Sequence, residues 1–304
     1  MLQEARKLID TGDGRMMKSR ARCWSFFGLS LLALVSCSPP ATNESPAAEN
    51  LAGGQSAVAH SNDNDRITQI SVINALMLGH YDGVATIEEM LRHGDFGLGT
   101  LDHLDGELIV LDGAVYQVRG DGTVVDVAAD QTTPFAIVTT FDNDGEFHRE
   151  AIASLKDLDR LLDDAIGQQN NFVAIRVDGQ FESITVRSVQ RQEPPYRPLA
   201  EVAKSQGTWT HENLRGTLIG IRCPAWTQGL NVPGFHWHFI SDDRQVGGHV
   251  LACQIRDADV HYDVCTDWVV KLPDSAAFNS LNLGQDLREE LESVEKSRTD
   301  KAAE

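Results

Sequence analysis

The spacing of apolar residues predicts a few short helices among many strands. The clearest helical stretch covers residues 154–166, where leucines recur at intervals of three and four residues and Gly167 can end the helix. A shorter helix is expected at residues 86–93, because Thr86 can cap it and two glutamates occupy its first turn. Weaker helical patterns lie at residues 199–205 and 285–296, and residues 67–78 fit either a strand or a short helix.

Strands are predicted wherever runs of β-branched residues flank an Asp-Gly pair, because that pair tolerates the positive φ angles of a tight hairpin turn. The four pairs are Asp105-Gly106, Asp112-Gly113, Asp121-Gly122 and Asp178-Gly179. Beyond Pro194-Pro195, further strands are expected at residues 216–224, 234–241 and 247–255. The predicted fold class is α/β of the α+β type, with two mainly β subdomains, mixed and antiparallel sheets and a few helices.

Composition divides the chain into four segments. These are residues 1–36, a signal peptide; 37–65, a flexible tether; 66–197, an N-terminal mixed-sheet subdomain; and 198–304, a C-terminal metal-binding β subdomain with a tail helix. The tether is rich in Ala, Ser, Pro, Asn and Gly, so it has too little apolar surface to offset the entropy of ordering. The boundary near residue 197 follows the proline pair.

The first segment has the features of an export signal. A basic flank precedes an apolar run, residues 26–35, that is too short to cross a bilayer. The sequence Leu34-Val35-Ser36-Cys37 resembles the lipobox of bacterial lipoproteins, in which the cysteine is lipidated and becomes the mature N-terminus. We therefore expect a periplasmic or cell-surface lipoprotein anchored at Cys37. The alternatives are an ordinary cleaved signal and a translation start at Met16 or Met17, and the membrane that carries the anchor stays open.

The chain is strongly acidic, with a formal net charge of −19. Removal of residues 1–36 takes away six basic and three acidic residues, which brings the charge to −22. Nucleic acid is excluded as a partner because phosphates require a basic surface. A small anionic substrate would need a local cation or a metal ion to offset the long-range repulsion.

Three cysteines remain beyond the anchor, at Cys223, Cys253 and Cys265. In an oxidising compartment they allow at most one intrachain disulfide, and the sequence leaves its pairing open.

Three of the ten histidines, His236, His238 and His249, lie close together in the sequence. Alternate residues of a strand share a face, so His236 and His238 point the same way. The polar stretch 241–248 contains two glycines and can reverse the chain, which would bring His249 alongside on the same face. Three imidazoles can bind one Zn²⁺ ion and leave a fourth position open, as catalytic zinc sites require. His-x-His alone is common on half-buried strands, so the prediction of a zinc site depends on the third histidine, His249.

A second alternating set, His261, Asp263 and Cys265, is also spaced like metal ligands. For these residues, and for Cys253, packing or disulfide chemistry is the favoured interpretation.

Several segments resemble the α-acetolactate decarboxylase family, in the same order along the chain. They are GDFGLGTLDHLDGELIVLDGAVYQV, TPFAIVTTF, FVAIRVDGQF with TVRSVQRQEPPYRPLAEV, and GTLIGIRCP with VPGFHWHFISDDRQVGGHVL. The resemblance covers about residues 67–297. It implies a two-part architecture dominated by sheet, a homodimer, a zinc ion held by three histidines, and conversion of 2-acetolactate to acetoin and CO₂.

The resemblance also assigns site residues motif by motif. The zinc ligands would be His236, His238 and His249. The active-site residues would be Thr100 in GLGT, Glu107 in DGEL, Arg187 in TVRSV with Arg176 ranked second, and Glu295 in the tail with Glu292 or Glu304 as alternatives. The lipoprotein start departs from the family forms and puts the compartment in question.

The expected chemistry uses a small anionic 2-hydroxy-3-keto acid, (S)-2-acetolactate, and yields (R)-acetoin. Zinc would polarise the ketone and hydroxyl oxygens and stabilise an enediolate as CO₂ leaves. Arg187 would bind the carboxylate, Glu107 would transfer a proton to C2, and Thr100 would hydrogen-bond an oxygen. No sequence signature indicates an organic cofactor. Other branched 2-hydroxy-3-keto acids satisfy the same chelation, so the physiological substrate stays open.

Two other functions fit part of the pattern. A cupin-like oxygenase or isomerase also has His-x-His on a strand, but Asp242 or Asp243 would have to replace its usual glutamate, and His249 follows too soon. A non-catalytic exported metal-binding lipoprotein would need neither Glu107 nor Arg187. An assay for acetoin separates these functions.

Overall fold

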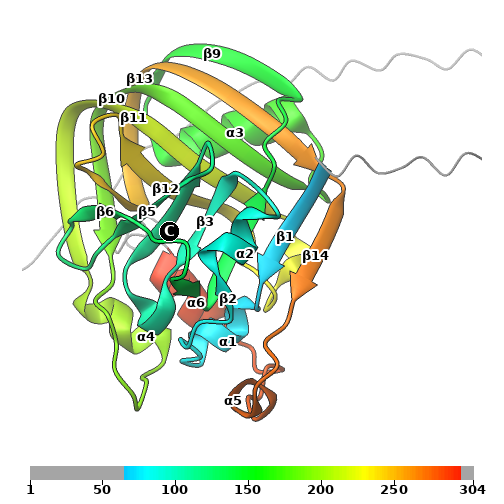
Figure 1. Ribbon diagram of the computed structural model, residues 1–304. Coiled ribbons are helices and arrows are strands. Elements are labelled where there is room, and N and C mark those ends of the chain that lie inside the picture. The colour runs from blue at the N-terminus through cyan, green and yellow to red at the C-terminus, as the bar shows by residue number, and fades with distance from the viewer. Residues whose placement is uncertain (1–64, 296–304) are drawn as a thin grey trace, which may run out of the picture. The chain divides into compact units, whose positions relative to one another are not determined.

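The computed structural model describes residues 65–295, and these residues fall within one compact unit (Figure 1). The predicted signal peptide, Cys37, nearly all of the predicted tether, and Glu304 lie outside the described residues. The helices are α1 (Ile73–Met77), α2 (Ile87–Leu91), α3 (Leu155–Ile166), α4 (Leu199–Val202), α5 (Ala276–Asn279) and α6 (Arg288–Glu295), with short 3-10 turns at Asp102–Leu104, Ala203–Ser205 and Ala225–Thr227. No helix in this part of the chain combines the length and apolar character needed to span a membrane.

Two large sheets make up most of the described chain, which confirms the α+β class. The seven-stranded sheet has the order β14 (Asp267–Lys271), β1 (Arg66–Ile70), β8 (Phe135–Thr139), β3 (Phe96–Thr100), β4 (Glu107–Leu111), β5 (Ala114–Val118), β6 (Val124–Asp126). The five-stranded sheet has the order β10 (Phe172–Ser188), β11 (Gly207–Cys223), β12 (Gly234–Ser241), β13 (Gly247–Cys265), β9 (Gly145–Ile152), and β2 (Ala85–Thr86) pairs separately with β7 (Thr132–Thr133).

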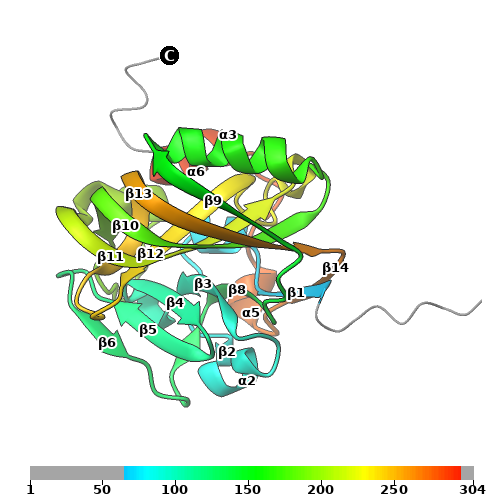
Figure 2. The ribbon, with the colours of Figure 1, turned by 90° about the horizontal axis from the view of Figure 1, so that it is seen from above.

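The two sheets pack face to face, and α3 covers the outer face of the five-stranded sheet (Figure 2). Between the sheets lies an apolar core to which both contribute alternate residues, among them Leu98 and Ile109 from one and Ile219 and Ile240 from the other. This layering matters for function because it brings β4 of one sheet against β12 of the other.

The five-stranded sheet closes on itself, because β10 pairs with both β11 and β13. The strands are long, and β10 continues without a turn through Asp178 and Gly179. The hairpin predicted at this Asp-Gly pair is therefore wrong. The residues before and after this pair are hydrogen-bonded to β11 along one edge of β10 and to β13 along the other edge. This pairing between strands overrides the local preference for a turn.

Other local predictions are confirmed. Asp112 and Gly113, with φ of 52° and 77°, form the two-residue turn between β4 and β5, and Asp121-Gly122 lies in the turn between β5 and β6. The Thr86 side chain accepts a hydrogen bond from the Glu89 N–H and so caps α2. The long predicted helix is α3, which Ser154 caps and Gly167 ends.

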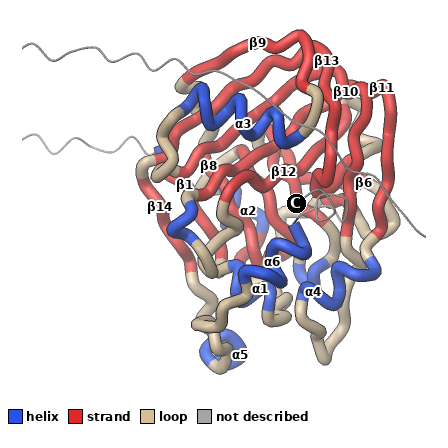
Figure 3. Tube along the Cα trace, turned by 180° about the vertical axis from the view of Figure 1, so that it is seen from behind, coloured by secondary structure: helices blue, strands red, loops and turns tan. Residues whose placement is uncertain are grey.

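Helices α1, α4 and α6 gather at one end of the molecule (Figure 3). Their apolar faces share a cluster with Leu104 and Phe135, so the C-terminal helix is fixed against the sheets. Each large sheet takes strands from both sides of residue 197, so neither sheet coincides with a predicted subdomain.

The three cysteines of this region, Cys223, Cys253 and Cys265, are buried free thiols. Burial raises the pKa of each thiol. They contribute to packing in this structure.

Candidate metal centre

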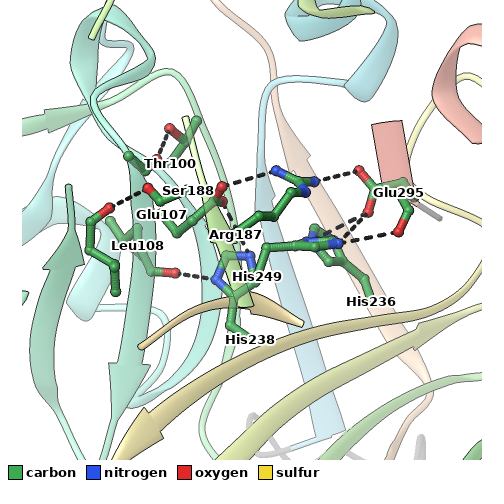
Figure 4. A network of polar contacts seen from close by, with 11 residues as sticks. Thr100, Glu107, Leu108, Arg187, Ser188, His236, His238, His249 and Glu295 are labelled. Carbon is green, nitrogen blue, oxygen red and sulfur yellow. Dashed lines mark hydrogen bonds and ion pairs between the residues drawn. The ribbon is translucent and has the colours of Figure 1, made fainter. Parts of the chain in front are cut away.

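The sheet register aligns the histidines. His238 on β12 lies directly opposite His249 on β13, and His249 lies directly opposite Arg187 on β10. Residues paired in this way share one face of a sheet, and His236 shares it too because it is two residues from His238. The predicted hairpin therefore brings three imidazoles together, and β10 adds an arginine beside them (Figure 4).

These three buried histidines each offer a nitrogen, and the three nitrogens lie within 4.8 Å of one another. His238 Nδ1 is 2.9 Å from the Leu108 carbonyl oxygen. A carbonyl only accepts, so Nδ1 carries the proton and Nε2 keeps its lone pair. His238 Nε2 is buried and has no hydrogen-bond partner. This orphaned nitrogen is the arrangement that a metal ion would complete.

The protonation state of the cluster also suits a metal. Burial, aided by the charge of Arg187, lowers the pKa of His236 to about 3. The pKa values of His238 and His249 are lowered well below the ordinary value, again mainly by burial. All three rings are therefore neutral near pH 7, and neutral imidazole is the ligand form.

Glu107 reaches the cluster from the other sheet. It begins β4, and its Oε2 lies 3.5 Å from His238 Nε2. Burial raises the pKa of Glu107 to about 7, while Arg187 opposes the rise and Glu295 adds to it. Thr100 pairs with Glu107 across β3 and β4, and its hydroxyl donates to the Gly106 carbonyl over 2.6 Å.

Arg187 lies between two carboxylates. Its Nη1 donates to Glu107 Oε1 over 3.0 Å, and its Nη2 is 3.8 Å from Glu295 Oε1. The side chain is almost fully buried, and its Nε has no hydrogen-bond partner. A buried guanidinium with an unused donor can bind a further anion.

Glu295, the last described residue of α6, faces two of the histidines. Its Oε2 is 3.6 Å from His249 Nε2 and 3.7 Å from His236 Nε2. Burial raises its pKa, and the charge of Arg187 opposes the rise. One group therefore contains the three histidines, Glu107, Arg187 and Glu295. These residues come from segments spread over most of the described chain.

The residues ranked second lie elsewhere. Arg176 forms ion pairs with Asp112 and Asp178 at 2.8 and 2.6 Å, so it is committed outside the cluster. Glu292 is exposed one turn earlier on α6. Asp242 pairs with Arg215, and Asp243 accepts from Ser241.

The second histidine set forms no such centre. His261 pairs with Glu146, and among residues 65–295 the set His261, Asp263 and Cys265 does not converge on one point. Packing is therefore the interpretation of these three residues that fits the structure.

A cavity of about 40 Å³, here called the inner cavity, touches Thr100, Glu107, Arg187, His236, His249 and Glu295. Its apolar walls include Leu104, Phe135 and Val294. Sequence reasoning missed these walls and the Leu108 carbonyl that orients His238. Apolar residues carry no chemical signature, and a backbone carbonyl has none at all, so only the packing of the two sheets could reveal them.

The family model described as alpha-acetolactate decarboxylase matches residues 67–285. A Methanosarcina mazei protein named alpha-acetolactate decarboxylase is 45% identical over 235 residues, which is 77% of this chain and 82% of that protein. A Bacillus subtilis protein of the same name is 36% identical over 233 residues, which is 76% of this chain and 91% of that protein.

Solved structures agree with the sequence matches. The structure of alpha-acetolactate decarboxylase from Bacillus subtilis superposes with a TM-score of 0.75 at 36% identity, covering 76% of this chain and all of that one. A Staphylococcus aureus protein, described as of unknown function and similar to alpha-acetolactate decarboxylase, superposes with a TM-score of 0.71 at 30% identity and covers 75% of this chain and 98% of that one.

Proposed function

Because the chain belongs to the alpha-acetolactate decarboxylase family, we propose that it converts (S)-2-acetolactate to (R)-acetoin and CO₂ at the centre described above, with zinc as its metal. The observation that carries the proposal is the convergence of three neutral imidazoles with one buried arginine, the buried carboxyl group of Glu107 and the partly buried carboxyl group of Glu295. A purely structural metal site would not need a buried arginine with an unused donor beside the ligands.

Zinc is proposed because three neutral nitrogen ligands suit it better than the hard cations, which prefer oxygen. His236, His238 and His249 would hold the ion, and His238 already presents an unpartnered nitrogen. When bound, the ion would supply Lewis acidity toward the ketone and hydroxyl oxygens of the substrate.

Arg187 is proposed to bind the substrate carboxylate. Its guanidinium can grip two oxygens at once and keeps its charge, and its burial strengthens that attraction relative to water. A fixed cation is needed because the chain carries a net charge of −19.

Glu107 is proposed to deliver the proton. When CO₂ leaves, the bonding electron pair stays with the C2–C3–oxygen unit, and C2 must take up one proton to give acetoin. With a pKa of about 7, Glu107 is a carboxyl group that can hold this proton and release it near neutral pH. Solvent then returns one proton to Glu107 for each turnover. Because Glu107 lies on β4, the proton would reach C2 from one side only, and one enantiomer of acetoin would form.

The proposed location is outside the cytoplasm, with the lipid anchor at Cys37. The support is the sequence from Leu34 to Cys37. Incorporation of labelled fatty acid into the wild-type chain, and its loss in Cys37→Ala, is the expected result. A homodimer is also proposed from the family resemblance, and sedimentation of the purified protein measures it.

An acetoin assay on purified protein tests the function. Racemic acetolactate should yield acetoin, a chelator should stop the reaction, and zinc should restore it. Absence of acetoin from protein that holds one metal ion per chain would overturn the proposal. His148→Ala, which alters an exposed histidine on β9, is the matched control and should retain full activity.

A further inference from the structure

The inner cavity is too small for the substrate that the proposed function requires. Its volume of about 40 Å³ is close to the space of a single water molecule, whereas acetolactate is a branched five-carbon acid. Binding of the substrate at Glu107 and Arg187 therefore needs more space than this cavity provides, and a neighbouring space that opens into it would supply that space.

Such a space lies next to it. A cavity of about 390 Å³, here called the outer cavity, has the size of a small-molecule site. Its walls come from α3, α6, the start of β12, and β13, and include Lys156, Phe235, Trp237, Leu251, Arg288 and Glu292. The two cavities share His249 and Glu295, so these side chains are the partition between them.

The sheet topology explains why the outer cavity exists. β12 pairs with β13 over only three residue pairs, ending at His238 and His249, and then separates from it. β9 does not begin to pair with β13 until Ile255. Along residues 250–254 this edge of β13 therefore has no neighbouring strand. The opening is bordered by α3 and α6 instead, and its inner end is at the metal centre.

The charges of the outer cavity also suit a small anion better than the rest of the surface does. Lys156 and Arg288 contribute two positive charges against the carboxylates of Asp159, Glu292 and Glu295. Asp159 accepts a hydrogen bond from the Trp237 indole, and burial raises its pKa to about 7, so it carries only part of its charge. The lining is thus nearly balanced in a chain whose net charge is −19.

We propose that the outer cavity is the entry compartment of the enzyme, where a small 2-hydroxy-3-keto carboxylate binds near Arg288 before the Glu295 side chain turns aside and admits it to the metal centre. The proposal rests on the proposed function and adds a second binding place to it. Glu295 then has two positions, one beside His249 and His236 and one withdrawn.

A bulky residue in the outer cavity tests the route. Leu251→Trp fills the cavity from β13, and we expect kcat/KM for acetolactate to fall by about tenfold or more while zinc content stays at one ion per chain. Leu214→Trp is the matched control, because Leu214 is partly buried on β11 and does not line the cavity. It should leave kcat/KM within about twofold of wild type.

A charge reversal tests the binding of the anion. Arg288→Glu should lower kcat/KM by about tenfold, and added salt should recover part of the loss because it screens the new repulsion. A structural defect would not respond to salt in this way, and a glutamate at the start of α6 favours the helix. Arg160→Glu on α3 is the control, because Arg160 is exposed and outside the cavity.

The outcomes separate the two proposals. If the wild type makes acetoin and both Leu251→Trp and Arg288→Glu retain its kcat/KM, the entry compartment is wrong and the proposed function stands. If the wild type with full zinc makes no acetoin, the function fails. In that case the compartment fails with it, because its ligand is the substrate.

Discussion

At the scale of the residue, Arg187 is the cation on which the proposed chemistry depends. It lies between Glu107 and Glu295 and directly opposite His249 in the sheet. The strand alternation in the sequence predicted that His236 and His238 share a face. It could not predict that Arg187 and His249 are paired, because that pairing joins residues far apart in the chain.

Arg187→Ala should lower kcat/KM by at least about a hundredfold and leave the proposed zinc ion in place, since its three candidate ligands come from β12 and β13. His238→Ala should lose both zinc and activity. Acetoin formation together with elemental analysis distinguishes these cases. Arg176→Ala is the control, because Arg176 forms ion pairs with Asp112 and Asp178 away from the centre. This variant should keep the kcat/KM of the wild type. Full activity in Arg187→Ala would refute the carboxylate assignment.

Asp263 makes a separate prediction about stability. Burial raises its pKa to about 7, helped by the charges of Asp144, Asp65 and Asp142, and its Oδ1 has no hydrogen-bond partner. The folded protein thus holds a proton on Asp263 that the unfolded chain releases near pH 4. The free energy of unfolding consequently falls as pH rises from about 4 to about 7.

Asp263→Asn keeps the shape of the side chain and removes the fall in the free energy of unfolding that accompanies rising pH. We expect its Tm to exceed that of the wild type by several degrees at pH 8 and to approach it near pH 4. Asp259→Asn, an exposed site on the same strand, should show no such pH-dependent gain. A Tm difference that is equal at both pH values would contradict the account.

At the scale of the element, α6 shows where sequence reasoning succeeds and where it ends. Its weak apolar stripe predicted a tail helix, and Leu291 and Val294 are indeed buried against α1 and α4. The chemical role of Glu295 had to be taken from the family resemblance. The sequence of the helix alone does not say which of its four glutamates faces the candidate metal centre, because that depends on how α6 packs against the sheets.

Glu295→Gln should therefore lower kcat by about tenfold or more, because the amide cannot carry the charge that faces His236 and His249. Glu289→Gln, in the exposed first turn of the same helix, should leave kcat unchanged. Steady-state kinetics on the two variants makes the comparison. Equal kcat values would remove Glu295 from the mechanism.

At the scale of the whole molecule, the predicted class was right and the arrangement of strands could not be foreseen. Local signals, such as the Asp112-Gly113 turn and the caps of α3, act over a few residues and were readable. The failed hairpin at Asp178-Gly179 and the closure of β10 on β13 are decided by partners about 80 residues away. Hairpin signals also gave no hint that each sheet takes strands from both halves of the chain.

Metal removal is expected to weaken the whole fold. The ligands lie on β12 and β13, which hold each other over only three residue pairs, so a bound ion would join them a second time. A ligand that binds only the folded state raises its stability. Chelation should lower the Tm by several degrees and zinc should restore it, with differential scanning calorimetry as the measurement. His238→Ala should show the low Tm with or without zinc.

The pairing of β1 with β14 has a consequence for the order in which the protein forms. Arg66, at the start of the described chain, is held to Asp267 near its end, and the two strands run parallel along their full length. A growing or translocating chain cannot complete its larger sheet until residue 271 is available. Completion of this sheet therefore has to follow synthesis of residues 66–271, and contacts of such long range slow folding.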